Sequence, residues 1–228
     1  MRFPLFNVES NESVAIQGPI CLPTPLGVLQ FNLSIGEVLL GETRHDVGGI
    51  GGSMVCSWDA QMFRAEAIYG RIRPRIPKHM TVLDCWAIVW RVQVTSSPGG
   101  IRAIAQWAPD FVWSERGPES GQFLDAQAFE NAEVKLMIGT EDDEAMSRRA
   151  SSDMWMPKRL TRYIEMTHVP AEYRNDGLAT CIPSLEMGER CQLQFVVAWE
   201  EQAPDCISSW FAVEQDPDHI LKELLESR

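Results

Sequence analysis

The sequence predicts an all-β fold in which two antiparallel sheets pack face to face as a sandwich. In residues 68–76, Ile68, Ile72 and Ile76 share one face, an alternation that is typical of a β-strand. Residues 82–94 are apolar on nearly both faces, which indicates a strand covered on each side. Predicted strands do not alternate with long helices, which argues against a parallel βαβ fold. One face of 82–94 carries Val82, Trp86, Ile88, Trp90, Val92 and Val94, and the other carries Leu83, Cys85, Ala87, Val89, Arg91 and Gln93.

The chain has 228 residues, of which 45% are hydrophobic and eight are tryptophan, so it can fill a large core. Its length suits one β-domain or two small ones. The net charge of −12 at pH 7 argues against nonspecific nucleic-acid binding by the whole surface, because phosphate neutralisation needs clustered lysine and arginine. No long apolar run predicts a membrane-spanning helix, and the first residues lack the apolar core and cleavage site of a secretory signal.

The cysteines predict no disulfide framework. There are six, at wide and irregular spacings, and no recognisable signal peptide precedes them. We therefore expect buried free thiols in a reducing compartment. They are Cys21, Cys56, Cys85, Cys181, Cys191 and Cys206.

The first half of the chain predicts an extended arm, a broken strand, a glycine-rich loop, a short helix and two long strands. In this order they are residues 1–25, 26–40, 41–53, 57–67, 68–76 and 82–94. The break in the first strand is expected near Gly36. The helix is expected because Ser57 can cap it and Asp59 lies in its first turn.

The second half predicts further strands separated by long loops. The strands are residues 101–107, 133–138, 160–167, 177–183, 191–199 and 207–213. Between them lie a loop at 108–125 and an exposed loop or short helix at 141–155. Residues 215–228 predict an amphipathic helix, since Asp216 can cap it and Pro217 suits its first position. The total is seven to nine strands and one or two helices, with the sandwich domain at 26–214.

No motif for catalysis or cofactor binding is recognised in the sequence. The glycines of 48–52 match neither the dinucleotide fingerprint nor the P-loop, so a surface loop is favoured. The four histidines lack a second ligand at metal spacing, and the acidic run 141–144 lacks the alternation of a calcium loop. We therefore expect no catalytic residue, no cofactor, no metal ligand and no enzyme activity.

Three arginines, Arg71, Arg73 and Arg75, form a stripe on one face of the predicted strand 68–76. Guanidinium groups in such a row can contact RNA phosphates or pair with acids of an adjacent subunit. The same stripe can instead belong to an exposed edge strand that uses charge to prevent aggregation. The sequence leaves both interpretations open.

The order of elements resembles the coat proteins of plant picorna-like viruses, such as torradoviruses, cheraviruses, comoviruses and nepoviruses. The resemblance lies in the helix at 57–67, the strands 68–76 and 82–94, the Pro98–Gly99–Gly100 turn and the closing strand 192–199. It implies an eight-stranded antiparallel jelly-roll sandwich with one or two short helices. The mass of 25.7 kDa suits one member of a three-protein set.

The resemblance also implies a structural role. Such a chain would assemble with sibling capsid proteins and with copies of itself into an icosahedral shell around an RNA genome. It would lie in the virion, and in the host cytoplasm before assembly, without a membrane partner. The expected arm, residues 1–25, carries one basic side chain, Arg2, so contacts with viral RNA would be local.

The residues expected at subunit interfaces are apolar and lie in loops or in the C-terminal helix. They are Trp107, Phe111, Trp113, Trp155, Leu221 and Leu224. The competing interpretation is that the loop aromatics cap the core of their own domain. An alternative function is a monomeric β-sandwich that binds carbohydrate or protein through its loop tryptophans.

Overall fold

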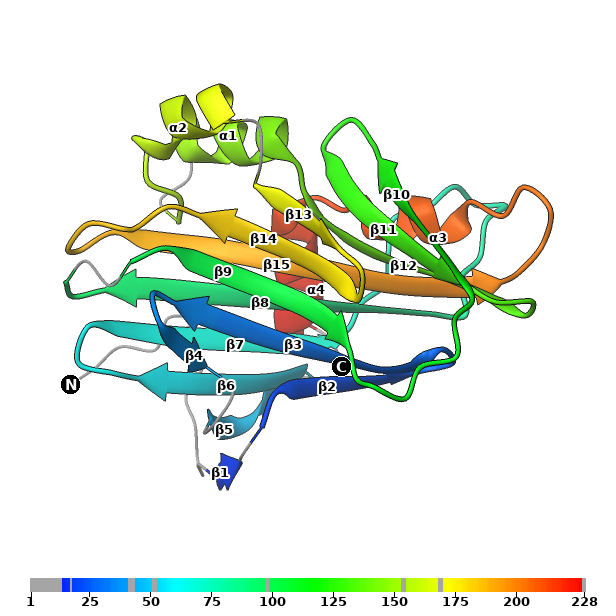
Figure 1. The fold of residues 1–228 in the computed structure, drawn as a ribbon, viewed down its shortest axis with the longest axis horizontal. Helices are drawn as coiled ribbons and strands as arrows, with labels where there is room; N and C mark the ends of the chain where they lie inside the picture. Colours follow the sequence, from blue (N-terminus) through cyan, green and yellow to red (C-terminus); the bar gives the residue numbers. More distant parts are fainter. Residues whose placement is uncertain are drawn as a thin grey trace.

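The computed structural model describes residues 14–16, 18–40, 44–50, 53–96, 99–152, 155–167 and 170–226, and of 14–16 and 44–50 it describes the backbone alone. Two antiparallel sheets account for most of these residues, so the predicted all-β sandwich is confirmed (Figure 1). The nine-stranded sheet consists, in spatial order, of β1 (Val14–Ile16), β5 (Arg44–Ile50), β6 (Ser53–Asp59), β7 (Phe63–Arg71), β8 (Asp84–Val94), β15 (Arg190–Glu201), β12 (Val134–Glu141), β11 (Leu124–Glu130) and β10 (Glu115–Ser120).

The six-stranded sheet packs on one face of the larger sheet. Its spatial order is β13 (Ala171–Arg174), β14 (Gly177–Ile182), β9 (Ile101–Trp107), β3 (Gly27–Ile35) and β2 (Ile20–Thr24), and β4 (Val38–Leu40) pairs with the far end of β3. The chain passes between the two sheets repeatedly, so strands that are distant in the sequence become neighbours. In the smaller sheet β9 lies between β3 and β14, and in the larger sheet β15 lies between β8 and β12.

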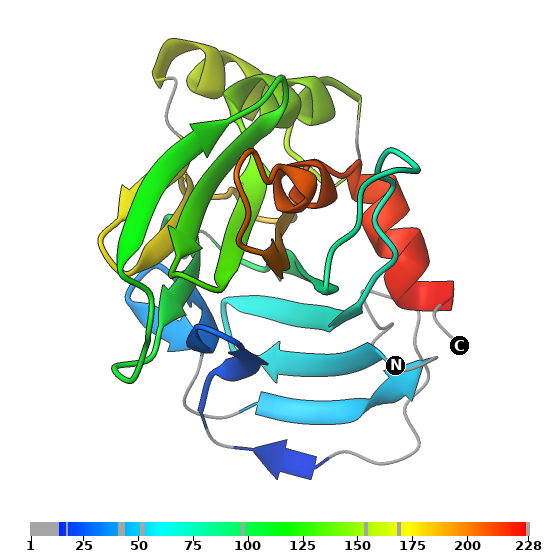
Figure 2. The ribbon, with the colours of Figure 1, turned by 90° about the vertical axis from the view of Figure 1, so that its right-hand side faces the viewer.

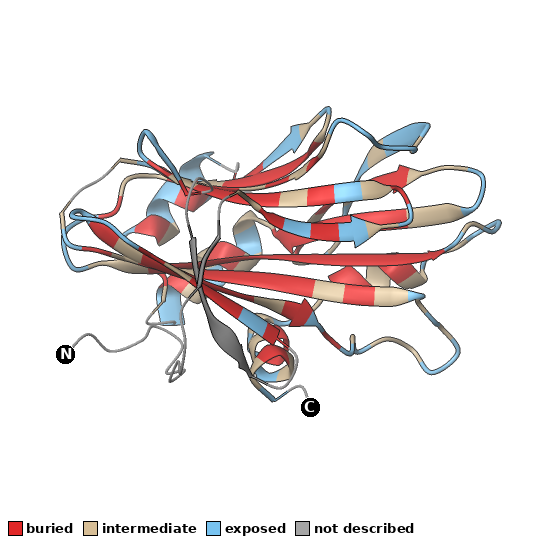
Figure 3. Cartoon of the chain, turned by 90° about the horizontal axis from the view of Figure 1, so that it is seen from below, coloured by how far each residue is buried: buried red, intermediate tan, exposed pale blue. Residues whose placement is uncertain are grey.

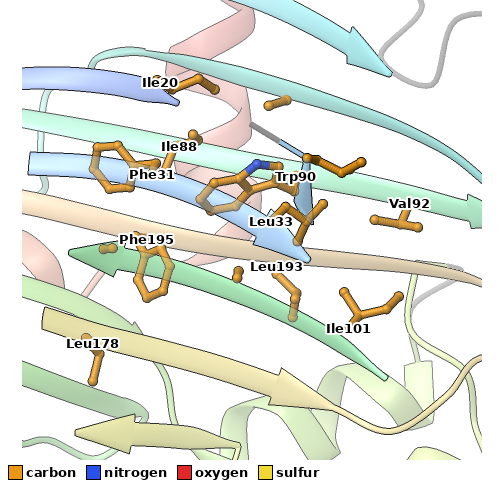
Figure 4. Packing of buried hydrophobic residues seen from close by; sticks show 14 of the residues in the cluster. Ile20, Phe31, Leu33, Ile88, Trp90, Val92, Ile101, Leu178, Leu193 and Phe195 are labelled. Carbon is orange, nitrogen blue, oxygen red and sulfur yellow. The ribbon is translucent and has the colours of Figure 1, made fainter. Parts of the chain in front are cut away.

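The core between the sheets is built around aromatic side chains of three strands. The rings of Trp90 and Phe195, from the larger sheet, meet edge to face at 5.9 Å, and Phe31 of the smaller sheet lies 6.3 Å from Trp90 (Figure 4). Such pairs add about 0.5–1.5 kcal/mol each beyond the burial of their area. The sequence predicts that Ile88 and Trp90 share one face of 82–94, and this is confirmed. Both side chains point into the core between the sheets and are about 1% exposed.

The outer face of the nine-stranded sheet carries a second core under two helices, α3 (Ser208–Val213) and α4 (Pro217–Glu226) (Figure 2). Cys85 and Val89 of β8 pack there with Ile220 and Leu224. The strand is therefore covered twice, as its sequence predicts. Burial raises the pKa of the Cys85 thiol far above its ordinary value, as suits a core residue.

The C-terminal helix begins as predicted. The Oδ1 atom of Asp216 accepts hydrogen bonds from the backbone N–H groups of Asp218 at 2.8 Å and His219 at 3.3 Å. A carboxylate at this position satisfies N–H groups that have no partner within the helix and stabilises it by about 1 kcal/mol.

Two further helices, α1 (Asp143–Ser152) and α2 (Leu160–Thr167), cover one side of the sandwich. Met146 and Ala150 of α1 are fully buried with Leu160 and Ile164 of α2, and all four extend the core between the sheets. Of the two possibilities left open for 141–155, the structure has the helix. The expected strand 160–167 is wrong, because these residues form α2. Leu160 and Ile164 are four residues apart, so they share a face in a helix as well as in a strand. Met166 would point inward in a strand but is 71% exposed.

Three other expected elements differ from the structure. Residues 57–67 form parts of β6 and β7 rather than a helix, because Trp58 and Phe63 insert into the core and the two strands pair through a tight turn. The glycine-rich segment 44–50 pairs as β5 with β1 and β6, whereas 51–52 lie outside the described residues. Residues 208–213 form helix α3 instead of a strand.

The strand count and the arm also differ. The described residues hold 15 strands, more than the seven to nine counted in the sequence and more than the eight of the expected jelly roll. Of the expected arm, Ile20–Thr24 is strand β2 with Ile20 buried, and residues 1–13 lie outside the described part. All six cysteines are free thiols, as expected, but only Cys56, Cys85 and Cys191 are buried, whereas Cys181 and Cys206 are partly exposed and Cys21 is exposed.

Candidate interaction surfaces

The arginine stripe does not lie on one strand face. Strand β7 ends at Arg71, because Pro74 lacks the N–H that a continued ladder would need. The backbone N–H groups of Arg73 and Arg75 instead donate to Glu223 at 3.2 Å and to the side chain of Gln215 at 2.8 Å.

The edge-strand interpretation of the stripe is wrong as well, because β7 is paired with β6 on one side and β8 on the other. The guanidinium of Arg71 is 2.9 Å from Asp84 and lies over the ring of Trp86. The side chains of Arg73 and Arg75 are exposed beside α4. All three guanidinium groups are exposed, that of Arg71 at the end of β7 and those of Arg73 and Arg75 on the loop that follows.

Three aromatic residues expected at a subunit interface, one at the end of β9 and two in the following loop 108–114, form a cluster at one end of the sandwich. Trp107 is buried, with its ring edge to face against Phe129 at 5.3 Å. Trp113 lies between Phe129 at 5.2 Å and Phe111, on which it stacks at 4.5 Å with an interplanar angle of 11°. Trp107 and Trp113 thus close the core of their own domain. Phe111 is 41% exposed and the adjacent Val112 61% exposed, so these two reach the surface.

Trp155 is held on the outer face of the nine-stranded sheet. The guanidinium carbons of Arg91 and Arg190 lie 4.3 Å and 5.4 Å from its ring centre, and its carbonyl accepts the N–H of Gln192. All eight tryptophans lie in the described part of the chain, and none of them is classed as exposed. A ligand platform of open indole rings, the basis of the alternative function, therefore has no support in this geometry.

The two leucines expected at an interface lie against their own domain. Leu224, on the inward face of α4, is fully buried, and Leu221 of the same helix is partly buried in the same cluster. Leu224 therefore does not reach the surface, because the apolar face of the C-terminal helix covers the larger sheet.

A buried ion pair that the sequence does not indicate joins β12 to α1. Arg149 donates two hydrogen bonds to the carboxylate of Glu141, at 2.7 and 2.8 Å, and a third to the carbonyl of Gln192 at 2.8 Å. Glu141 is only 5% exposed, so removing its partner would leave a buried charge without compensation. Glu141, the first residue of the segment 141–155 that was expected to be an exposed loop or a short helix, is thus buried.

A cavity of about 390 Å³ lies beside this ion pair, between α1, β12 and the segment that joins α3 to α4. Its lining includes Phe123, Gly139, Arg148, Val213 and Ile220. The volume would admit a small molecule. The ion pair satisfies the buried charge of its wall, so the cavity offers a mostly apolar lining with a polar rim.

Carboxylates gather at the start of α1. Burial raises the pKa of Asp142 to about 6, and the negative charges of Asp125, Asp143 and Glu144 act in the same direction. The Oδ1 atom of Asp142 accepts the N–H of Ala145 at 2.8 Å and so caps the helix. Over the described ranges, no group of three or more His, Cys, Asp or Glu side chains is arranged to hold a metal ion.

Among the helices of the described residues, none is long and apolar enough to cross a membrane. No known protein-family model matches the chain, and no curated protein matches it.

Proposed function

We propose that this chain is a coat-protein subunit that assembles with sibling capsid proteins and with copies of itself into an icosahedral shell around an RNA genome. It would reside in the virion, and in the host cytoplasm before assembly. The proposal includes a jelly-roll ancestry for the sandwich, with strands and helices added to an eight-stranded core.

The observation that carries the proposal is the path of the chain between the sheets. Strand β3 lies in the smaller sheet, β5 to β8 in the larger, β9 in the smaller, β10 to β12 in the larger, β13 and β14 in the smaller, and β15 in the larger. Repeated crossing, with β9 and β15 each lying between two strands that are distant in the sequence, supports a sandwich built through long crossover connections. Jelly rolls are sandwiches of two sheets joined by such crossovers, and they recur in viral capsids.

The distribution of exposed apolar side chains supports assembly with several neighbours. At one end of the sandwich, Met62 and Met187 are 39% and 78% exposed, and at the other Leu83 and Val112 are 55% and 61% exposed. The loops at both ends contain many exposed residues (Figure 3). Burying apolar side chains of this kind between subunits would stabilise a shell by about 25 cal/mol per Å².

RNA contact in this proposal is local. The overall charge of −12 repels a polyanion, so exposed basic side chains would have to make the contact. Arg73 and Arg75 are exposed on the loop beside α4 and are the groups that we assign to it.

The test is expression of the chain together with the neighbouring protein products of the genome that encodes it. Sedimentation through a sucrose gradient and negative-stain microscopy should show particles of uniform diameter that contain this chain. Omission of this chain, with the other products still expressed, is the matched control and should abolish closed particles. If closed particles form equally well without it, or if it never enters them, the coat-protein function is wrong.

A further inference from the structure

The outer face of the six-stranded sheet is bare in the described residues. No helix lies in front of β2, β3, β9 and β14, whereas the outer face of the larger sheet carries α3 and α4 (Figures 1 and 2). Strand alternation identifies its side chains. Ala103 and Ala105 are buried in the sandwich, so Ile104 and Gln106 point outward, and strand register aligns the outward residues of the neighbouring strands with them.

This surface, called the neutral face below, spans four adjacent strands and β4, and Arg102 is the one charged side chain among its outward residues. Its outward residues are Cys21, Pro23, Val28, Gln30, Asn32, Ser34, Leu39, Arg102, Ile104, Gln106, Ala179 and Cys181, of which Asn32 and Ala179 are buried by their neighbours. The guanidinium of Arg102 forms an ion pair with Glu172 of the neighbouring β13, and Arg174 pairs with Asp176 at the margin of the face.

A face of this extent with so little charge is unusual for this chain. Charged residues make up 23% of the sequence, and the open face of an antiparallel sheet normally carries many of them. Depletion of charge is the feature that distinguishes the centre of a protein interface from the rest of a surface. On the neutral face Val28 is 36% and Leu39 is 50% exposed, so it also offers apolar area to a partner.

We propose that the neutral face binds the neutral face of a second copy of this chain. The charge of the protein argues for this occupant. Two copies that each carry −12 repel one another when their charged surfaces approach within a Debye length of about 8–10 Å. Contact through this sheet face, whose one outward charge is paired with Glu172, keeps most of these charges farther apart, whereas a strongly charged partner would find little counter-charge there.

The size of the face fits a weak pair. It is four strand positions wide, because β2 and β4 pair with the same edge of β3, and with about 4.8 Å between strands and about seven residues per strand at about 3.4 Å each it covers roughly 450 Å² in projection. This area is below the roughly 800 Å² per partner of a standard interface and is in the range of small, transient ones. In a two-fold pair each residue would be used twice, so a single substitution changes two contacts.

This inference deepens the proposed assembly and rests on it, since both require the chain to bind copies of itself. The first experiment is sedimentation velocity on the purified full chain from about 1 to about 100 μM, a range suited to micromolar association. The wild-type mass should rise to that of a dimer. The double variant V28K/I104K should dimerise at least 100-fold more weakly, because it brings four ammonium groups together in the pair.

The matched control is Ala203→Lys, which adds a charge at an exposed position in the segment between β15 and α3 and should leave dimerisation unchanged. Far-UV circular dichroism checks that each variant is folded. If V28K/I104K does not fold, Gln30→Lys places one charge per chain at the same face and should weaken the dimer at least tenfold. A wild-type chain that stays monomeric at the highest concentration overturns the proposal, as does a dimer insensitive to these charges.

A second readout locates the contact on the native protein. The exposed thiol of Cys21 lies on the neutral face, and the partly exposed thiol of Cys206 lies in the segment between β15 and α3. The rate of maleimide labelling at Cys21 should fall as protein concentration rises, while the rate at Cys206 should not. A dimer in which Cys21 labels as fast as in the monomer uses another surface and refutes the proposal.

The two proposals fail in distinguishable ways. If V28K/I104K enters closed particles as well as the wild type does, the neutral face is not the contact, and the coat-protein function stands. If the wild type forms a charge-sensitive dimer but never enters particles, the neutral-face contact stands and the coat-protein function is wrong.

Discussion

Asp142 gives the clearest stability prediction, because its carboxylate caps α1 while three other acids lie near it. Its pKa is raised from 3.8 to about 6, first by burial and then by these like charges. A folded-state pKa above the unfolded value means that the native state binds the proton more tightly. The resulting stabilisation is complete below pH 3.8 and is lost as the pH rises through about 6. At neutral pH the charged form therefore costs stability.

The substitution Asp142→Asn removes this charge and keeps the cap, since an amide oxygen can still accept the N–H of Ala145. A shift of about two pKa units corresponds to about 3 kcal/mol. Because the side chain is only partly buried, solvent screening reduces the expected gain to about 1 kcal/mol. We expect the variant to be more stable than the wild type by this amount at pH 7, with the advantage declining to nearly zero by pH 4.

Urea unfolding followed by tryptophan fluorescence at pH 4, 5, 6 and 7 measures this difference. Asp110→Asn is the matched control, because it removes one charge from an exposed loop and should shift stability by less than about 0.5 kcal/mol. The reasoning fails if Asp142→Asn lowers stability at pH 7, or if the difference between the two proteins does not change with pH.

Three other substitutions test the geometry. Gly177→Ala should destabilise the fold by at least about 3 kcal/mol, because the new Cβ would lie 1.9 Å from the carbonyl oxygen of Ala105. The loss should appear as a lower urea midpoint. A midpoint within error of the wild type would contradict the close contact between β9 and β14 at this position. Arg149→Met should cost about 3–5 kcal/mol, and adding Glu141→Leu should recover much of it, because the loss arises from a buried unpaired charge; additive losses in a double-mutant cycle would refute this. Phe111→Ser should change stability by less than about 1 kcal/mol yet reduce particle yield, measured on sucrose gradients, since half of the ring faces solvent; undiminished assembly would remove Phe111 from the interface.

Patterns within a single strand or helix could be predicted from the sequence. The two faces of 82–94 are distinguishable because β8 is buried on both sides, so its alternation reflects two different cores. The start of α4 is predictable because Asp216 and Pro217 act locally, through a cap and a fixed φ angle.

Other segments were misread where a local signal competed with tertiary packing. The cap signal at Ser57 was overridden because Trp58 and Phe63 gain more by entering the core as strand residues. Leu160 and Ile164 are four residues apart and share a face in both a helix and a strand, so their spacing alone cannot decide. For the arginine stripe, Pro74 was the signal that should have ended the strand.

The interaction surfaces depend on register, and for this reason the sequence does not reveal them. Glu141 and Arg149 meet only because α1 folds back beside the end of β12. The neutral face brings Cys21 together with Cys181, which lies 160 positions later and three strands away. Each of its strands, read alone, shows ordinary small and polar residues on the outward side.

The two outer faces of the sandwich are treated differently by the chain, and this difference bears on assembly. The larger sheet uses its own C-terminal helices to bury an apolar patch around Val89, so that face is completed within one subunit. The smaller sheet has no such cover among the described residues, and on its neutral face Arg102 is the one outward charge. A surface with so little charge on a strongly acidic protein costs solubility unless a partner covers it. We therefore regard the neutral face as the side on which the subunit is incomplete, and the ends of the sandwich as the sides that further neighbours would use.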